Sequence, residues 1–184
     1  LVLNFAAESH VDNSYSNARD FYEANVIGTM GVIEFCMANS ARLLHMSTDE
    51  VYGEVLDVAA TELTTLNPTN PYSASKAAAD IMVQTYINCF SLDAKIIRAN
   101  NIFGPGQLSE KVIPKAIKSA TNKYSFFLHG SKKLVRNFLH TNDFVGALNI
   151  ILETWSSDKS VIYNIAGTDD IQIRDLVEFI YKRC

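Results

Sequence analysis

The chain has 184 residues, and its hydrophobic fraction of 48% is enough to build the core of one domain of ordinary density. A formal net charge of -4, without any run of Lys and Arg, argues against a nucleic-acid partner, and three widely spaced cysteines argue against a zinc site. No apolar run approaches the ~18 residues that cross a bilayer and no signal-peptide pattern opens the chain, so we expect a cytoplasmic protein with reduced, buried thiols and no membrane partner.

Strand and helix patterns alternate along the first half of the chain. We expect these elements at residues 1–5, 19–39, 43–46, 73–90 and 94–98. Near-continuous apolar strands joined by helices are typical of a parallel sheet covered on both faces. The pattern predicts a Rossmann-like, doubly wound α/β domain over residues 1–105, and such sheets bind ligands beyond the carboxyl ends of their strands.

The second half has a looser pattern. Helices are expected at residues 112–123 and 142–154, a strand at 161–166, and a last helix from residue 173. Pro114 would lie in the first turn of the first of these helices, and Thr141 would be the N-cap of the second. This mixture indicates a smaller α+β lobe over residues 106–184, interleaved with the first domain.

Small residues follow the first strand, where Ala6 and Ala7 would let a flat ligand lie close to the backbone. Ser9 and His10 follow them after Glu8. On this segment alone, small residues needed only for a tight turn, with His10 as an ordinary loop histidine, explain the pattern as well.

The second strand ends in Ser47 and Thr48, followed by the acids Asp49 and Glu50. Adjacent residues of a strand face opposite sides, so both carboxyl groups reach one ligand only if the chain turns here. Ser47 or Thr48 as an N-cap would permit such a turn. The alternative is that both acids are solvated residues in the first turn of a helix, where they favour the helix dipole.

Tyr72 and Lys76 open the helix that follows Pro71, and a separation of four places them on one helix face. A phenol with a pKa near ~10 is a poor base at neutral pH, but a nearby ammonium stabilises the phenolate and lowers the pKa. The pair therefore predicts a proton shuttle for a substrate hydroxyl. An exposed helix start remains the alternative.

Together these segments resemble the NDP-glucose 4,6-dehydratases, which are NAD-dependent extended short-chain dehydrogenases. The resemblance rests on Ser-Thr-Asp-Glu-Val-Tyr-Gly at residues 47–53, Asn-Pro-Tyr-x-x-x-Lys at 70–76 and Ala-Ala-x-x-His-Val-Asp at 6–12. Further matches lie at residues 101–105, 110–114, 136–139 and 163–165. The most specific part is the Asp49-Glu50 pair, because related epimerases and decarboxylases lack this Asp. The family's glycine-rich turn for the cofactor diphosphate would precede Leu1, so we expect the chain to lack it.

The resemblance implies conversion of UDP- or dTDP-glucose to a 4-keto-6-deoxy sugar with loss of water, without net redox change. Tyr72, with Lys76 and a hydrogen bond from Thr48, would take the proton of the 4-hydroxyl while hydride moves to NAD. Glu50 would then remove the C5 hydrogen, and a protonated Asp49 would donate to the departing 6-hydroxyl.

The resemblance also assigns binding residues to two groups. The cofactor would be held by Phe5, Ala6, Ala7, Ser47, Tyr72 and Lys76. The sugar nucleotide would be held by Ser9, Thr48, Asn101, Lys111, His129 and Arg136. Arg136 is a candidate diphosphate clamp because a guanidinium binds phosphate oxygens in a fork, although a simple surface charge is the alternative. A histidine at position 129 favours UDP over dTDP.

Related enzymes pair through a four-helix bundle, which implies a homodimer built from residues 19–39 and 73–90. Ala77, Ala78 and Ala79 would allow close contact between the helices. Two other functions stay open at this point. A sugar-nucleotide epimerase or decarboxylase of the same fold would not need Asp49, and the chain could also be a non-catalytic fragment.

Overall fold

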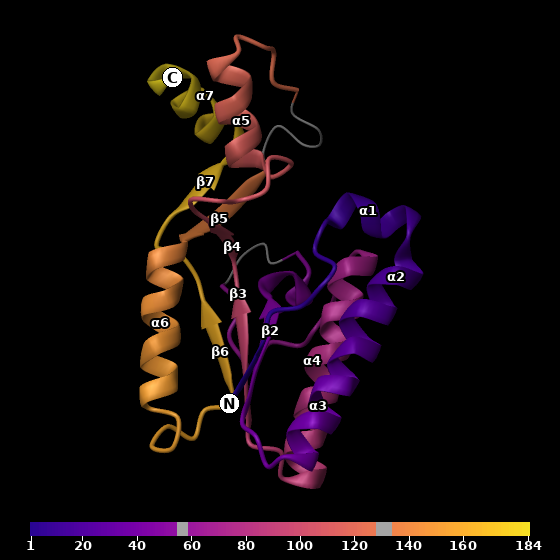
Figure 1. Ribbon diagram of the computed structural model, residues 1–184. Coiled ribbons are helices and arrows are strands. Elements are labelled where there is room, and N and C mark those ends of the chain that lie inside the picture. Colours follow the sequence, from indigo (N-terminus) through magenta and orange to yellow (C-terminus); the bar gives the residue numbers. More distant parts are fainter. Residues whose placement is uncertain (55–58, 128–133) are drawn as a thin grey trace. The chain divides into compact units, whose positions relative to one another are not determined.

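The computed structural model describes residues 1–54, 59–127 and 134–184 (Figure 1). They fall into two units, Leu1–Ala99 with Trp155–Ile165 and Asn100–Thr154 with Ala166–Cys184. The first boundary therefore lies after Ala99 rather than at residue 105. The reason is that the short strand β4 (Asn101–Phe103) pairs with a strand of the second unit.

A parallel sheet forms the centre of the first unit. Its strands are β1 (Val2–Asn4), β2 (Leu43–Thr48), β3 (Ala94–Ala99) and β6 (Ile162–Ile165), in the order β1-β2-β3-β6. Every neighbouring pair is parallel, so all four carboxyl ends meet at one edge of the sheet. All residues of β3 are buried, as expected of a strand covered on both faces. The predicted Rossmann-like α/β class is confirmed.

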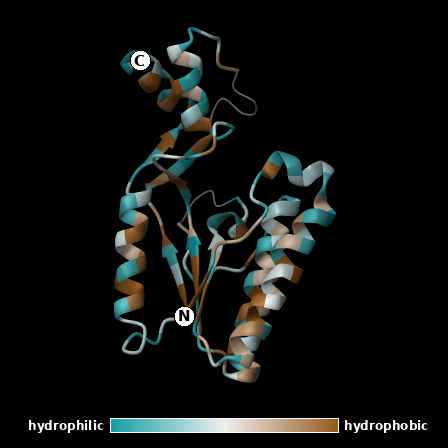
Figure 2. Ribbon diagram, viewed as in Figure 1, coloured by the Kyte–Doolittle hydropathy of each residue, from teal (hydrophilic) through white to brown (hydrophobic). Residues whose placement is uncertain are grey.

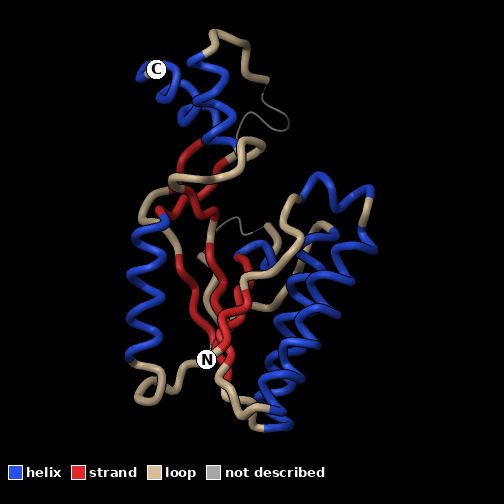
Figure 3. Tube along the Cα trace, viewed as in Figure 1, coloured by secondary structure: helices blue, strands red, loops and turns tan. Residues whose placement is uncertain are grey.

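The helices of the first unit form one layer, in which the last two helices contact the sheet and the others pack chiefly against the last helix (Figure 3). They are α1 (Val11–Ser16), α2 (Ala18–Tyr22), η1 (Glu23–Ile27), α3 (Gly28–Ala38) and α4 (Pro71–Phe90). Ile33 of α3 and Val83 of α4 are fully buried against Leu43 and Ile96 of the strands. The helix expected at residues 19–39 is thus present, but a π-helical segment, η1, interrupts it.

Helix α4 begins two residues earlier than the pattern predicted, because two reciprocal hydrogen bonds cap its N-terminus. The Asn70 side chain accepts a hydrogen bond from the Ser73 backbone N–H at 2.8 Å, and Ser73 Oγ accepts one from the Asn70 N–H at 3.2 Å. Pro71 occupies the first helical position, where its missing N–H has no helical partner to lose. This reciprocal cap fixes where Tyr72 and Lys76 stand.

The second unit has a mixed sheet, in which β5 (Val135–His140) lies between β4 and β7 (Asp170–Gln172). Strand β5 is parallel to β4 and antiparallel to β7. The helices of this unit are α5 (Val112–Thr121), α6 (Thr141–Glu153) and α7 (Ile173–Arg183). Ala116, Ile173, Val177 and Ile180 form its core. Of all helices in the described part of the chain, none is long and apolar enough to cross a membrane.

Two expectations about single residues are wrong. Thr141 is not the N-cap of α6, because His140 still has the extended backbone of β5 and its Nδ1 accepts the bond from the Asn142 N–H at 3.2 Å. The three cysteines are unpaired, but only Cys36 is buried. Cys89 and Cys184 are exposed because they lie at the ends of α4 and α7.

Gly53, which follows the second strand, has a backbone that only glycine adopts without strain. Its φ is +74°, and a Cβ placed there would stand 2.1 Å from the Asn67 carbonyl oxygen. We predict that Gly53→Ala lowers the free energy of unfolding by about 1–3 kcal/mol in a denaturant titration. Gly31→Ala on α3, where a Cβ meets no atom within 4 Å, is the matched control and should stabilise the protein by up to ~1 kcal/mol. Equal effects of both changes would contradict this account.

Candidate active site

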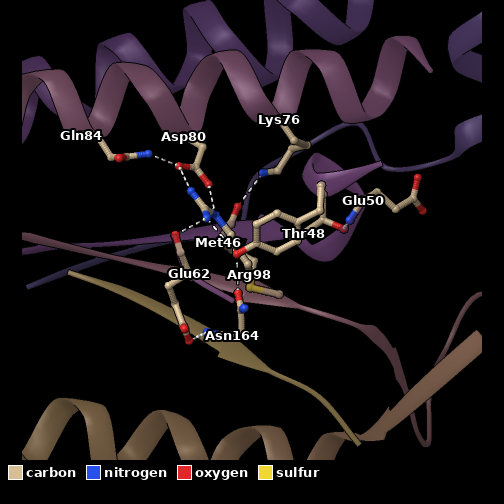
Figure 4. Close-up of polar contacts among 10 residues, drawn as sticks. Met46, Thr48, Glu50, Glu62, Lys76, Asp80, Gln84, Arg98 and Asn164 are labelled. Carbon is tan, nitrogen blue, oxygen red and sulfur yellow. Dashed lines mark hydrogen bonds and ion pairs between the residues drawn. The ribbon is translucent and has the colours of Figure 1, made fainter. Parts of the chain in front are cut away.

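The residues expected to carry chemistry in the first unit gather where the parallel strands end. Thr48 is the last residue of β2, and Lys76 lies in the second turn of α4 (Figure 4). Tyr72 precedes Lys76 by one turn on the same helix. Phe5, Ala6 and Ala7 follow β1, and all three are exposed. This is the sheet edge at which α/β folds bind ligands.

The two acids lie on a 3-10 turn, η2 (Asp49–Tyr52), as the predicted cap requires. Thr48 Oγ1 accepts a hydrogen bond from the Glu50 N–H at 3.3 Å and donates to Asp49 Oδ1 at 3.1 Å. Glu50 Oε2 in turn accepts from Asn70 Nδ2 at 3.1 Å. The turn therefore places both carboxyl groups at one strand end and ties Glu50 to the cap of α4, a role for Asn70 that the sequence did not indicate.

Lys76 is 4% exposed, and its Nζ donates to the Met46 carbonyl oxygen at 2.5 Å. Burial lowers the pKa of this ammonium to about 8, against the opposing effect of the Asp80 carboxylate. Burial raises the pKa of the Tyr72 phenol above its ordinary value; the negative charge of Glu50 adds to this, while a hydrogen bond with Thr48 lowers it. The expected lowering of the Tyr72 pKa is therefore wrong for the protein alone, because the phenol is buried beside acids.

A buried polar residue that the sequence reasoning missed is Asn25, which is 1% exposed in the π-helical segment η1. Its side-chain amide donates to Ser75 Oγ at 2.8 Å and to the Glu8 carbonyl oxygen at 3.0 Å, and it accepts from the Glu8 N–H at 2.9 Å. Asn25 thus links the loop after β1 to helix α4. A polar amide within an apolar helical pattern is the signal that could have found it, and π-helical turns are frequent at functional sites.

The same strand ends offer a place for a flat polar cofactor. Ser47 is 3% exposed, and its Oγ has no hydrogen-bond partner in the described part of the chain, so it can bind a ligand atom. Ala6 and Ala7 have side chains too small to block close approach to the backbone. Within the described residues, no group of three or more His, Cys, Asp or Glu side chains could hold a metal ion.

In the second unit, a pocket of about 240 Å³ brings together Asn101 and Arg136, two of the residues expected to hold the substrate. Phe126, Phe127 and Phe138 also line it, together with Lys115 and Glu110. Lys115, whose Nζ stands 5.8 Å from the Phe126 ring centre, was not predicted. Lys111 precedes α5 as its N-cap residue and is not among the residues that line this pocket, whereas Lys115 lies one turn further along and lines it.

Two other residues were expected to hold the substrate. Ser9 is exposed in the loop between β1 and α1 of the first unit. His129, on which the preference for UDP depended, lies outside the described residues.

The sequence profile of the family described as GDP-mannose 4,6 dehydratase matches residues 1–184. The chain belongs to this family. The match spans both units, and it confirms the resemblance inferred from the strand-end motifs.

Relatives in this family are similar along nearly the whole chain. A dTDP-D-glucose 4,6-dehydratase of Dictyostelium discoideum is 42% identical over 181 residues, which is 92% of this chain and 41% of that protein. A trifunctional UDP-glucose 4,6-dehydratase, 3,5-epimerase and reductase of Arabidopsis thaliana is 38% identical over 98% of this chain and 28% of its own length. The chain thus spans less than half of these two proteins.

A solved structure has the same fold. The dTDP-glucose 4,6-dehydratase DesIV of Streptomyces venezuelae, determined with NAD bound, superposes with a TM-score of 0.92 at 35% identity. The comparison covers 98% of this chain and 56% of that one.

The depressed pKa of Lys76 has a consequence for stability. The folded protein loses this proton near pH 8, whereas an unfolded lysine keeps it to its ordinary pKa of 10.5, so the unfolded state binds more protons between these values. We predict that the free energy of unfolding rises with pH between about 8 and 10. Lys76→Met should reduce this rise, measured by denaturant titration at several pH values.

Burial also lowers the pKa of Lys95, so Lys95 makes its own contribution to the rise of the unfolding free energy with pH. The slope of Lys76→Met is therefore compared with the slopes of the wild type and of a control variant, and a slope of zero is not expected. Lys118→Met, which removes an exposed lysine of α5, is the matched control and should leave the rise unchanged. A wild-type slope in Lys76→Met would show that Lys76 titrates at its ordinary pKa.

Proposed function

We propose that the protein with this chain removes water from UDP- or dTDP-glucose and yields the 4-keto-6-deoxy sugar nucleotide, with NAD as its cofactor. The observation that carries the proposal is the η2 turn, which presents Asp49 and Glu50 together and is bonded through Asn70 to the helix of Tyr72. Family membership supports it, as do the dehydratase names of the relatives.

Oxidation at C4 is the first step. Tyr72 takes the proton of the 4-hydroxyl, and Thr48, which is hydrogen-bonded to the phenol, orients it. Phe5, Ala6, Ala7 and Ser47 would hold NAD, which would supply the hydride acceptor for C4, the hydride for C6 and a positive ring charge that favours the phenolate. Lys76 holds a second positive charge one helical turn from Tyr72.

Loss of water is the second step. The 4-ketone acidifies the C5 hydrogen, so a carboxylate can remove it at neutral pH. Glu50 is the base, because its carboxylate is held in place by the Asn70 amide. Asp49 donates a proton to the 6-hydroxyl, which leaves as water, and a proton returns to C5 when hydride reaches C6.

The pocket of the second unit binds the nucleotide. Three phenylalanine rings suit a flat base, and the Arg136 guanidinium and Lys115 ammonium suit the diphosphate. Asn101 adds an amide at the same pocket, where its Nδ2 donates to the Asn137 carbonyl oxygen at 3.2 Å. The choice between UDP and dTDP rests on His129 alone and stays a prediction.

The two chemical steps can be separated by substitution. In the protein at its full natural length, we predict that Glu50→Gln still oxidises C4 but cannot remove the C5 hydrogen, so NADH absorbance builds up within a single turnover. Tyr72→Phe is the matched control, because loss of the first base should slow all turnover by ~100-fold or more. Exchange of solvent deuterium into C5 at the normal rate in Glu50→Gln would contradict the role of Glu50. A product with the mass of the substrate, rather than one lighter by water, would indicate an epimerase.

We also propose a homodimer formed through α3 and α4, which carry hydrophobic residues along much of their length (Figure 2). Phe35 on α3 and Ile81 on α4 are 57% and 52% exposed, which leaves them free to meet a second copy. The expected close contact through Ala77, Ala78 and Ala79 does not involve all three residues, because Ala77 and Ala79 are buried within the unit.

Light scattering tests the dimer. We predict that the protein is dimeric at micromolar concentration and that Ile81→Glu weakens the dimer at least tenfold, because a buried charge at an interface is costly. Ile150→Glu, at a 63% exposed position of α6, is the matched control and should leave the dimer intact. A monomeric wild-type protein would contradict the proposal.

A further inference from the structure

A buried ion pair lies beneath the residues to which we assign catalysis. Arg98 on β3 is 2% exposed, and Asp80 on α4 is fully buried. The guanidinium donates from Nε to Asp80 Oδ2 at 2.8 Å and from Nη2 to Asp80 Oδ1 at 2.9 Å (Figure 4). Because this planar fork admits one geometry, it fixes helix α4 against strand β3 one turn beyond Lys76.

The third nitrogen of the same guanidinium reaches the turn that carries the two acids. Arg98 Nη1 donates to the Tyr52 hydroxyl oxygen at 2.8 Å, and the guanidinium carbon stands 5.0 Å from the centre of the Tyr52 ring. The Tyr52 hydroxyl donates onward to Asn164 Oδ1 on β6 at 2.7 Å. Tyr52 is the last residue of η2, so one side chain bonds both the helix of Tyr72 and the turn of Glu50.

We propose that Arg98 is a positioning residue for the reaction: through Asp80 and Tyr52 it holds the turn Asp49–Tyr52 at a fixed place relative to α4. As a result, the distance between Tyr72, which acts in the oxidation, and the two acids of the turn, which act in the elimination, stays constant while both act on the same sugar. This inference rests on the proposed function, which assigns oxidation to the helix and elimination to the turn.

Stability alone is a weak reason for such a pair. Well-packed hydrophobic residues often replace a buried ion pair without loss of stability, whereas an aliphatic side chain cannot bond two elements in defined directions. The Nη1 of Arg98 also donates to the Glu62 carbonyl oxygen at 3.3 Å, and Gln84 donates to Asp80 Oδ1 at 2.7 Å. Asp80 further favours the charged form of Lys76. The pair thus makes hydrogen bonds to the helix and the turn that carry the proposed catalytic residues.

The test uses Tyr52→Phe in the protein at its full natural length. This change keeps the ring over Arg98 and the pair with Asp80, and it removes only the hydroxyl that connects Arg98 to the turn. Tyr163→Phe is the matched control. Its hydroxyl also accepts from a buried cation, Lys95 at 2.7 Å, and donates to Asp158 at 2.9 Å, but it belongs to none of the elements that carry the catalytic residues.

We expect Tyr52→Phe to slow the exchange of solvent deuterium into C5 by about tenfold or more, because small misplacements of a catalytic group are costly. Hydride transfer from C4 should stay within about twofold of wild type, so NADH builds up. Tyr163→Phe should change neither rate. Arg98→Lys keeps the charge but loses the fork, and it should show the same imbalance as Tyr52→Phe rather than rescue it.

A second measurement does not depend on activity. Hydrogen exchange of the amides in residues 49–53 reports on the turn, whose N–H groups include those of Glu50, bonded to Thr48 Oγ1, and Gly53, bonded to the Glu50 carbonyl oxygen. We expect about tenfold faster exchange in Tyr52→Phe than in wild type or Tyr163→Phe. Unchanged exchange, or equal slowing of both chemical steps, would overturn the positioning role. If the wild-type protein removes no water from either sugar nucleotide, the proposed function fails, and the exchange result still decides the role of Arg98.

Discussion

The burial of the Arg98 charge is the constraint on which the first unit depends. A guanidinium stays protonated in proteins, and it lies in an apolar interior only where acceptors surround it. Here a helix, a turn and a loop supply these acceptors through Asp80, Tyr52 and the Glu62 carbonyl group. Removing one partner of a buried ion pair typically costs about 3–5 kcal/mol. The same guanidinium therefore holds all three segments to strand β3. The position of the acids of η2 depends on these contacts.

A second set of polar contacts holds the same helix from the side of β1. The Asn25 amide satisfies both backbone groups of Glu8 and also bonds Ser75, which lies between Tyr72 and Lys76 on α4. Thr29 Oγ1 donates to the Asn25 carbonyl oxygen at 2.7 Å and so ties the π-helical segment to the next turn. Because α4 is held through Asn25 on one side and through Arg98 on the other, the start of the helix has little freedom to shift against the strand ends.

Burial also decides the charges at the site. It disfavours the ionised form of both Tyr72 and Lys76, so the pKa of the phenol rises and that of the ammonium falls to about 8. The Tyr72 phenol therefore keeps its proton in the protein alone, and a positive charge placed near it would favour loss of that proton. The aromatic and basic pocket of the second unit is chemically different, and it suits the binding of a nucleotide rather than proton transfer.

What the sequence by itself determined is local. The apolar runs predicted the parallel strands, Ser47 or Thr48 as an N-cap permitted the turn that presents Asp49 and Glu50, and the spacing of Tyr72 and Lys76 predicted one helix face, because caps and periodicity depend on near neighbours. What only the tertiary structure decided depends on residues far apart in the chain. Arg98 and Asp80 are 18 positions apart, Asn25 and Ser75 are 50, and Tyr52 and Asn164 are 112. The pKa of Tyr72 is raised rather than lowered for the same reason, because the fold buries the phenol and brings the charge of Glu50 close to it.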